Sequence, residues 1–222
     1  YYQVVVDFED QHKGKDYVLH AKITANKYVY IDINDIRILG GAANDTQFLQ
    51  LLKNAAPKKG ERLHHGKYEN YKSELLSLAN RKGFFDALDV MPAEIPPVVT
   101  HTGVQGVRPL WRNIDDQQIR AIAERNGTIG IICAAPFLAA EPGRRTYARI
   151  VDHMAHVIRV AGEDYVSLGS DFDGLITTPE GLPDITALPR LVQDMLERGW
   201  SDTRIQKILG GNFLRVVAQV QP

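Results

Sequence analysis

The sequence predicts an α/β protein with a parallel sheet, preceded by a small β-rich segment. Two observations in residues 71–222 predict the sheet: short apolar runs, and amphipathic stretches of about 10–15 residues that alternate with them. A third observation predicts the β-rich segment, because residues 1–39 are rich in β-branched and aromatic residues. The chain has 222 residues and is 44% hydrophobic, which is enough to bury a core as one or two domains.

Residues 1–70 form the predicted β-rich segment, whose family is unclear. Asn44 or Asp45 is expected to cap a helix whose apolar residues share one face. Residues 57–70 are polar without an apolar period, which predicts a linker and a domain boundary near residue 70. The expected strands of this segment are 4–6, 17–23, 28–31 and 36–39, with a hairpin turn at 25–27.

Residues 71–222 form the second predicted domain. Leu75, Leu76 and Leu78 indicate a short strand that precedes a helix at 84–91. After Pro96 and Pro97, strands and helices alternate, which is typical of βαβ units. The expected strands are 98–100, 128–133 and 165–169, and the expected helices are 115–125, 147–160, 188–198 and 202–209.

Composition excludes some classes of function. The 26 basic and 27 acidic residues give a net charge of -1, so no strong field favours nucleic acid or an acidic membrane surface. The single cysteine, Cys133, lies in an apolar run and is expected in the core. The sequence has no transmembrane stretch and no signal peptide, and it opens on Tyr1 without a Met, as expected if the true N-terminus is missing. Localisation therefore stays unknown.

Polar side chains follow the ends of the three later strands, at the edge where parallel α/β folds build their sites. His101 is a metal ligand, a general base or a residue bonded to backbone. Arg112 suits capture of a carboxylate, although its position alone favours a surface or capping role, and Asn113 is expected to cap the next helix. Asp171 and Asp173 form either a metal or proton-transfer site or an Asp-Gly turn.

Other polar clusters are interpreted as structural. His153 and His156 have ligand-like spacing, but they lie in mid-helix beside an apolar face, away from the strand ends. The pair at 64–65 lies in the polar linker and is expected to be solvated. Residues 32–35 have calcium-loop spacing only at their start, without the Gly and the distal Glu of such a loop.

Taken together, these clusters resemble the renal (membrane) dipeptidase family, over roughly residues 96–222. Their order and spacing, rather than any single cluster, carry the resemblance. The matching segments are Val98-Val99-Thr100-His101-Thr102-Gly103-Val104, Arg112-Asn113, Ile150-Val151-Asp152-His153, Val160-Ala161-Gly162, Leu168-Gly169-Ser170-Asp171-Phe172-Asp173-Gly174 and Lys207-Ile208-Leu209-Gly210-Gly211-Asn212-Phe213-Leu214-Arg215-Val216.

The resemblance implies a (β/α)8 TIM barrel, present here as its last strands in partial or divergent form, and a binuclear zinc site. It implies that His101 is a zinc ligand, that Arg112 with Asn113 binds the substrate, and that Asp171 is the catalytic acid/base. Arg112 would hold the terminal carboxylate of a dipeptide, and zinc would activate the attacking water. Asp152, His153 and the Gly-Gly-Asn segment would be framework.

The sequence departs from the family in its first half. The family's His-x-Asp pair is absent, and Asn80 stands where a second histidine ligand is expected, after the strand predicted at 75–78. Two hypotheses follow: a zinc dipeptidase, or a non-catalytic relative that keeps Arg112 as a binding or structural module. The chain would be a fragment, a gene-fusion product, or a protein completed by a homodimer or a partner chain. A third hypothesis gives residues 1–56 a carbohydrate-binding or scaffold role.

Overall fold

The computed structural model describes residues 5–13, 16–24, 30–31 and 40–221. It divides the chain into two compact units, Tyr1–Leu75 and Leu76–Pro222, and each is described by itself. The division falls inside helix α2 (His65–Val90). The linker predicted at 57–70 is therefore wrong in its second part, because residues 65–70 are helical. They are all exposed, and a solvated helical turn needs no apolar face.

The first unit contains an antiparallel hairpin and a short helix. Strand β1 (Val5–Lys13) pairs with β2 (Asp16–Thr24). A 3-10 helix, η1 (Gly40–Asn44), leads into α1 (Thr46–Ala55). Of the two candidate caps, Asp45 is the one used: its carboxylate accepts from the Gln47 and Phe48 main-chain N–H groups at 2.9 and 3.1 Å.

Several predictions for the first unit concern residues outside the described ranges. The strand at 36–39, the turn at 25–27 and the partial calcium-loop pattern at 32–35 all fall there. Of the strand predicted at 28–31, only Tyr30 and Ile31 are described, and Tyr30 forms an isolated antiparallel bridge with Arg62.

The strand predicted at 75–78 is wrong, because these residues lie in the middle of α2. The helix predicted at 84–91 is the last part of the same helix. Leu78 and Leu88 are buried, whereas Leu76 is 41% exposed. Three leucines within four residues resemble a short apolar strand. Only the polar residues on both sides, which continue the helix, distinguish a helix from a strand here.

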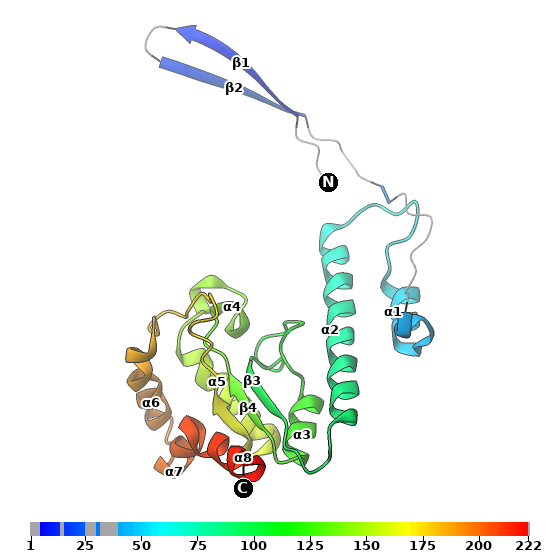
Figure 1. Ribbon diagram of the computed structural model, residues 1–222. Coiled ribbons are helices and arrows are strands. Elements are labelled where there is room, and N and C mark those ends of the chain that lie inside the picture. Colours follow the sequence, from blue (N-terminus) through cyan, green and yellow to red (C-terminus); the bar gives the residue numbers. More distant parts are fainter. Residues whose placement is uncertain (1–4, 14–15, 25–29, 32–39, 222) are drawn as a thin grey trace. The chain divides into compact units, whose positions relative to one another are not determined.

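Three parallel strands form the sheet of the second unit (Figure 1). They are β3 (Val98–Thr102), β4 (Thr128–Ile131) and β5 (Val166–Leu168), in the spatial order β3-β4-β5. All three lie where strands were predicted, and the parallel pairing is confirmed. The second unit is thus an α/β structure with a small parallel sheet.

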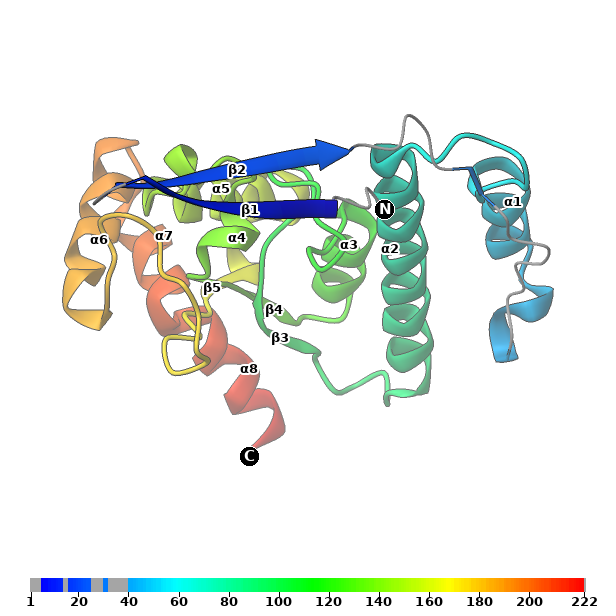
Figure 2. The ribbon, with the colours of Figure 1, turned by 90° about the horizontal axis from the view of Figure 1, so that it is seen from above.

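Helices connect these strands and pack around them, as Figure 2 shows from above. Helix α3 contacts α5 and β4, while α5 and α8 each contact β4 and β5. The elements after β3 are α3 (Asp116–Glu124), α4 (Ala135–Leu138), η2 (Pro142–Arg144), α5 (Ala148–Ala161), η3 (Glu163–Tyr165), η4 (Ile185–Ala187), α6 (Leu188–Glu197), α7 (Asp202–Gln206), the π-helical η5 (Lys207–Gly211) and α8 (Asn212–Val220).

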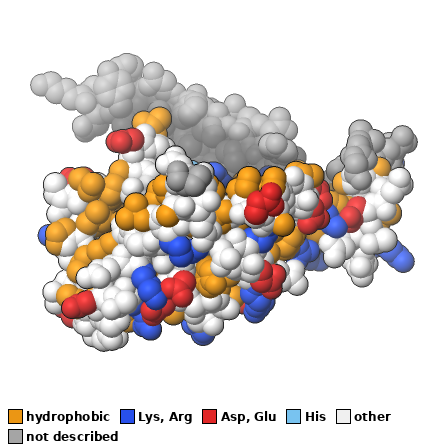
Figure 3. Space-filling view, turned by 60° about the horizontal axis from the view of Figure 1, so that its bottom comes forward, with side chains coloured by type: hydrophobic (Ala, Val, Ile, Leu, Met, Phe, Trp, Pro, Cys, Tyr) orange, Lys and Arg blue, Asp and Glu red, His pale blue; other side chains and the backbone are white. Residues whose placement is uncertain are grey.

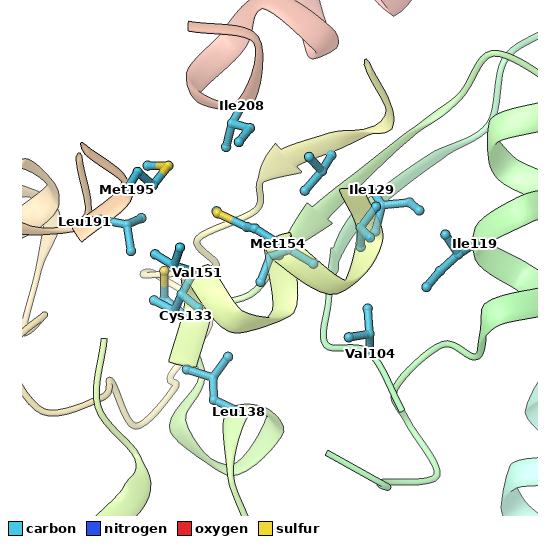
Figure 4. Close-up of a cluster of buried hydrophobic side chains, with 14 of the residues drawn as sticks. Val104, Ile119, Ile129, Cys133, Leu138, Val151, Met154, Leu191, Met195 and Ile208 are labelled. Carbon is cyan, nitrogen blue, oxygen red and sulfur yellow. The ribbon is translucent and has the colours of Figure 1, made fainter. Parts of the chain in front are cut away.

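The core of the second unit lies between the sheet and these helices (Figure 4). Ile119 of α3, Ile129 of β4 and Met154 of α5 are fully buried, and each such side chain contributes about 1.5–3 kcal/mol by leaving water. Cys133 is buried as expected, and burial raises the pKa of its thiol to about 12.

Two polar side chains tie the C-terminal helix to the starts of the strands. Asn212 is buried, and its amide donates to the main-chain oxygens of Glu163 and Val166, both at 2.7 Å. The Arg215 guanidinium donates to the main-chain oxygens of Asn126, Gly127 and Asp164. Asn212 of the Gly-Gly-Asn segment therefore has the framework role that was expected of that segment.

The surface mixes charge and apolar groups. Figure 3 shows Lys and Arg side chains interspersed with Asp and Glu on the face it presents. In the part of the chain that the structure describes, no helix has the length and apolar character needed to cross a membrane.

Candidate functional site

His101 and Asp171 come together at the C-terminal ends of their strands. His101 lies in β3, and its Nδ1 is 3.0 Å from the Thr100 hydroxyl. Its Nε2 is 4.0 Å from Oδ2 of Asp171, which lies just past β5. Their side chains are 44% and 25% exposed. A histidine and a carboxylate from different strands thus face one another within reach of solvent.

The turn after β5 holds the Asp171 carboxylate in place. Asp171 has a φ of 60°, in the left-handed region that Asp tolerates better than most residues. The Gly174 N–H donates to the Asp171 main-chain oxygen at 3.0 Å. A Cβ atom at Gly174 would overlap Oδ1 of Asp171, so a side chain at this position would displace the carboxylate. Asp173, by contrast, is exposed.

Two glycines shape the strand that carries His101. The pairing of β3 with β4 is irregular between Val99 and Thr102, and the Thr100 carbonyl oxygen approaches Gly130 and Gly169 closely. A Cβ atom at either glycine would overlap that oxygen. Irregularities of this kind often re-aim a side chain beside a site, and here the affected residues adjoin His101.

Arg112 lies in the segment between β3 and α3 and rests on aromatic rings. Its Cζ atom is 5.0 Å from the centroid of the Phe137 ring and 5.8 Å from that of Trp111. Within the described residues, no hydrogen bond or ion pair uses its N–H groups. The guanidinium therefore lies against two aromatic rings and has donors to offer. Neither Phe137 nor Trp111 was found from sequence, since no periodic pattern links them to Arg112.

Asn113 is a buried support rather than a helix cap. It is 2% exposed, and its Nδ2 donates to the main-chain oxygens of Arg108 at 2.9 Å and Phe137 at 3.0 Å. The expectation that it caps α3 is wrong, because Asp115 is the cap and forms a capping box with Gln118. The capping box pattern, in which an acid is followed three residues later by Gln, would have indicated Asp115.

The ligand set implied by the resemblance is not assembled by the described residues. Asn80 lies on α2 instead of at a strand end, and its Nδ2 donates to the Trp111 main-chain oxygen at 3.0 Å. Across the described ranges, no three His, Cys, Asp or Glu side chains come together in an arrangement that could hold a metal ion. A catalytic zinc site needs three protein ligands, so His101 and Asp171 do not fit a zinc ion by themselves.

His153 and His156 are structural, as their mid-helix position indicated. His153 is fully buried; its Nδ1 accepts from the Val104 N–H at 2.9 Å, and its Nε2 donates to the Leu138 main-chain oxygen at 3.1 Å. His156 lies between Asp116, at 2.6 Å, and Arg159, also at 2.6 Å. Both imidazoles are fully engaged inside the fold.

Because of His153, the stability of the protein is expected to decrease as the pH is lowered. Burial, the largest effect, lowers the pKa of this histidine to about 4, against about 6.5 in an unfolded chain. Above pH 6.5 both states are neutral, and below it only the unfolded state gains a proton, so the contribution is lost as pH falls. We expect about 1 kcal/mol less stability at pH 5.5 than at pH 6.5 from this residue.

Urea denaturation of the protein and of His153→Gln at both pH values measures that loss. Glutamine keeps one donor and one acceptor but does not titrate, so subtracting its pH dependence removes the contributions of the other six of the chain's 7 histidines. Equal pH dependence in the two proteins would contradict a neutral, buried His153.

Comparison with known proteins identifies the family to which this fold belongs. Among solved structures, the chain is similar to the dipeptidase AC, a metallopeptidase of family M19, with 32% identity and a TM-score of 0.57. It is equally similar to a metallopeptidase from Rhodobacter sphaeroides that was solved with a phosphinate mimic of the dipeptide L-Ala-D-Ala. Each match covers 67% of this chain and 46% of the other.

A family model for membrane dipeptidase (peptidase family M19) matches residues 76–222, about two thirds of the chain. The chain therefore belongs to the membrane dipeptidase family, through the part that forms its second unit. The resemblance found in the sequence is confirmed, and the family is one of metallopeptidases.

Two curated relatives support the same family assignment. An uncharacterized protein in the pqqA 5′ region of Klebsiella pneumoniae is 40% identical over 149 residues, which cover 65% of this chain and 54% of the relative. The dipeptidase ataJ of Aspergillus terreus is 37% identical over 138 residues, or 61% of this chain and 33% of the relative. The matched part of the chain thus spans between a third and about half of the length of these relatives.

Proposed function

We propose that this chain recognises the free carboxylate of a dipeptide through Arg112 and forms part of a metal-dependent dipeptidase site. The observation that carries the proposal is the state of the Arg112 guanidinium, which lies over the Phe137 ring and has no acceptor among the described residues. Two parallel N–H···O bonds from such a group suit a planar carboxylate. A substrate with a free C-terminal end is the ligand that this chemistry favours.

Asp171 is the proposed acid/base. In hydrolysis of a peptide bond, a carboxyl group beside the scissile bond accepts the proton of the attacking water and delivers one to the leaving amine. Its turn holds the Asp171 carboxylate 4.0 Å from the His101 imidazole. His101 is the residue that we propose as a ligand of the family's metal, and zinc is the metal implied.

The proposed whole is a (β/α)8 barrel in which β3, β4 and β5 are neighbouring strands. In the described part of the chain, β3 and β5 each pair with a strand on one side only. Further strands, from a completing partner chain or a homodimer, would give both edges a neighbour and bring the additional ligands that catalytic zinc requires.

A second function is a binding module without catalysis. It is favoured by the ligand count, since no group of three metal-binding side chains occurs in the described ranges. In that case Arg112 would still bind carboxylate ends, but Asp171 would have no reaction to serve.

Zinc content and hydrolysis of Ala-Ala decide between these two functions. The protein is washed with chelator, reloaded with zinc, analysed for bound metal and assayed for released alanine. For the enzyme we expect bound zinc and hydrolysis, and we expect Asp171→Asn to lower the rate by about 10²–10⁴-fold. Asp173→Asn is the matched control, because this neighbouring carboxylate is exposed and has no proposed role.

The two outcomes are distinct. Zinc-dependent hydrolysis that Asp171→Asn removes and Asp173→Asn retains supports the dipeptidase. Ala-Ala binding that Arg112→Gln abolishes, with no zinc and no hydrolysis, overturns catalysis and leaves the binding module.

A further inference from the structure

Phe137 supports the guanidinium that the proposed function depends on. Its ring centroid is 5.0 Å from Cζ of Arg112, inside the range of about 6 Å in which a cation is attracted to an aromatic face. The guanidinium thus lies over the Phe137 ring, and no hydrogen bond or ion pair among the described residues uses its N–H groups. The N–H groups around its edge stay available, and the edge is what a carboxylate binds.

A buried hydrogen bond connects the two partners through the main chain. Asn113, the residue after Arg112, donates to the Phe137 main-chain oxygen at 3.0 Å and to that of Arg108 at 2.9 Å. With 2% exposure and both amide protons used, Asn113 has no donor left for a ligand. Its Oδ1 is buried without a hydrogen-bond partner among the described residues, and a Cβ atom on Gly103 would overlap it.

A second buried side chain, His153, also links the segment that carries Arg112 to the helix that carries Phe137. His153 accepts from the Val104 N–H and donates to the Leu138 main-chain oxygen. Val104 begins the segment that leads to Arg112, and Leu138 follows Phe137 in α4 (Figure 4). The segment after β3 and the helix after β4 are therefore joined at two places, directly through Asn113 and indirectly through the His153 imidazole of α5.

We infer that Phe137 is a positioning residue that holds Arg112 with its donor edge presented to the ligand, and that Asn113 fixes Phe137 for this task. The inference rests on the proposed function, in which Arg112 binds the substrate carboxylate. It assigns Asn113, expected from the sequence to bind substrate, to a role in which it acts through its neighbour.

Calorimetric titration of the full chain with Ala-Ala and with its C-terminal amide tests the inference. Phe137→Leu removes the aromatic face but keeps an apolar side chain, and we expect it to weaken Ala-Ala binding about 2- to 30-fold, the range of a cation–π contact. Affinity for the amide should change less, so the preference for the acid should fall. Phe137→Tyr keeps the ring and should restore both.

A nuclear magnetic resonance measurement reports on Arg112 without any ligand. Protons next to the guanidinium of a stacked arginine are shifted by the ring current, so we expect the Arg112 side-chain signals to move toward random-coil positions in Phe137→Leu and not in Phe137→Tyr. Phe84→Leu is the matched control, since it makes the same exchange at another half-buried phenylalanine.

These measurements test the positioning role of Phe137 and the proposed function of Arg112 separately. Phe137→Leu that is folded, binds Ala-Ala like the wild type and leaves the Arg112 signals in place overturns the positioning role. Arg112→Gln that binds Ala-Ala like the wild type overturns the proposed function, whereas the ring-current shift still decides whether Phe137 orders Arg112.

Discussion

Replacing His153 by leucine is expected to lower the free energy of unfolding by about 3–5 kcal/mol. The imidazole is fully buried between the Val104 N–H and the Leu138 main-chain oxygen. Leucine satisfies neither, and a buried polar group without a partner costs about 1–3 kcal/mol. Urea denaturation followed by circular dichroism measures the loss.

His153→Gln is the control for this prediction. Its side-chain amide has one acceptor and one donor group that can replace Nδ1 and Nε2, so we expect it to recover a large part of the stability that leucine loses. A loss below about 1 kcal/mol in His153→Leu would mean that the two main-chain groups find other partners.

Alanine at Gly130 is expected to destabilise the protein by about 3 kcal/mol, the upper part of the usual range for overpacking. The new Cβ atom would overlap the Thr100 main-chain oxygen and lie 3.0 Å from the Gly169 Cα atom. Because both neighbours are main chain, relief requires β3 to move away from β4. His101 would move with it, so ligand binding near this edge should also weaken.

Gly143→Ala provides the comparison for Gly130→Ala. Nothing lies within 4 Å of a Cβ atom at Gly143, and the substitution should change stability by no more than about 0.5 kcal/mol. Thermal or urea unfolding of the two variants in parallel gives the difference. Similar stabilities would show that the β3–β4 contact is looser than its geometry indicates.

The second unit could be predicted well because its pattern is redundant. The strands at 98–102, 128–131 and 166–168 are short, overlap apolar runs and are separated by amphipathic helices, so period, length and turn signals agree. The strand predicted at 75–78 failed where these signals conflict. Leu75, Leu76 and Leu78 favour a strand, but α2 continues through them.

The candidate site could be predicted only in part. The positions of His101 and Asp171 at strand ends follow from the sequence, and the structure places them 4.0 Å apart. The contact between Arg112 and Phe137 could not be inferred, because it joins residues of different βα units through side-chain packing. The burial of Asn113 was missed for the same reason, since an Asn in a loop usually suggests a cap or a turn.

The chain also contains a chemical reporter of its own opening. Cys133 is the single cysteine of the sequence; it lies just past β4, and its N–H donates to the Ser170 main-chain oxygen next to Asp171. A buried thiol with a pKa of about 12 does not react at neutral pH, because the thiolate is the nucleophile. The rate at which a thiol reagent labels the protein therefore measures how often this edge of the sheet becomes exposed, and a bound ligand that closes the edge would slow that rate.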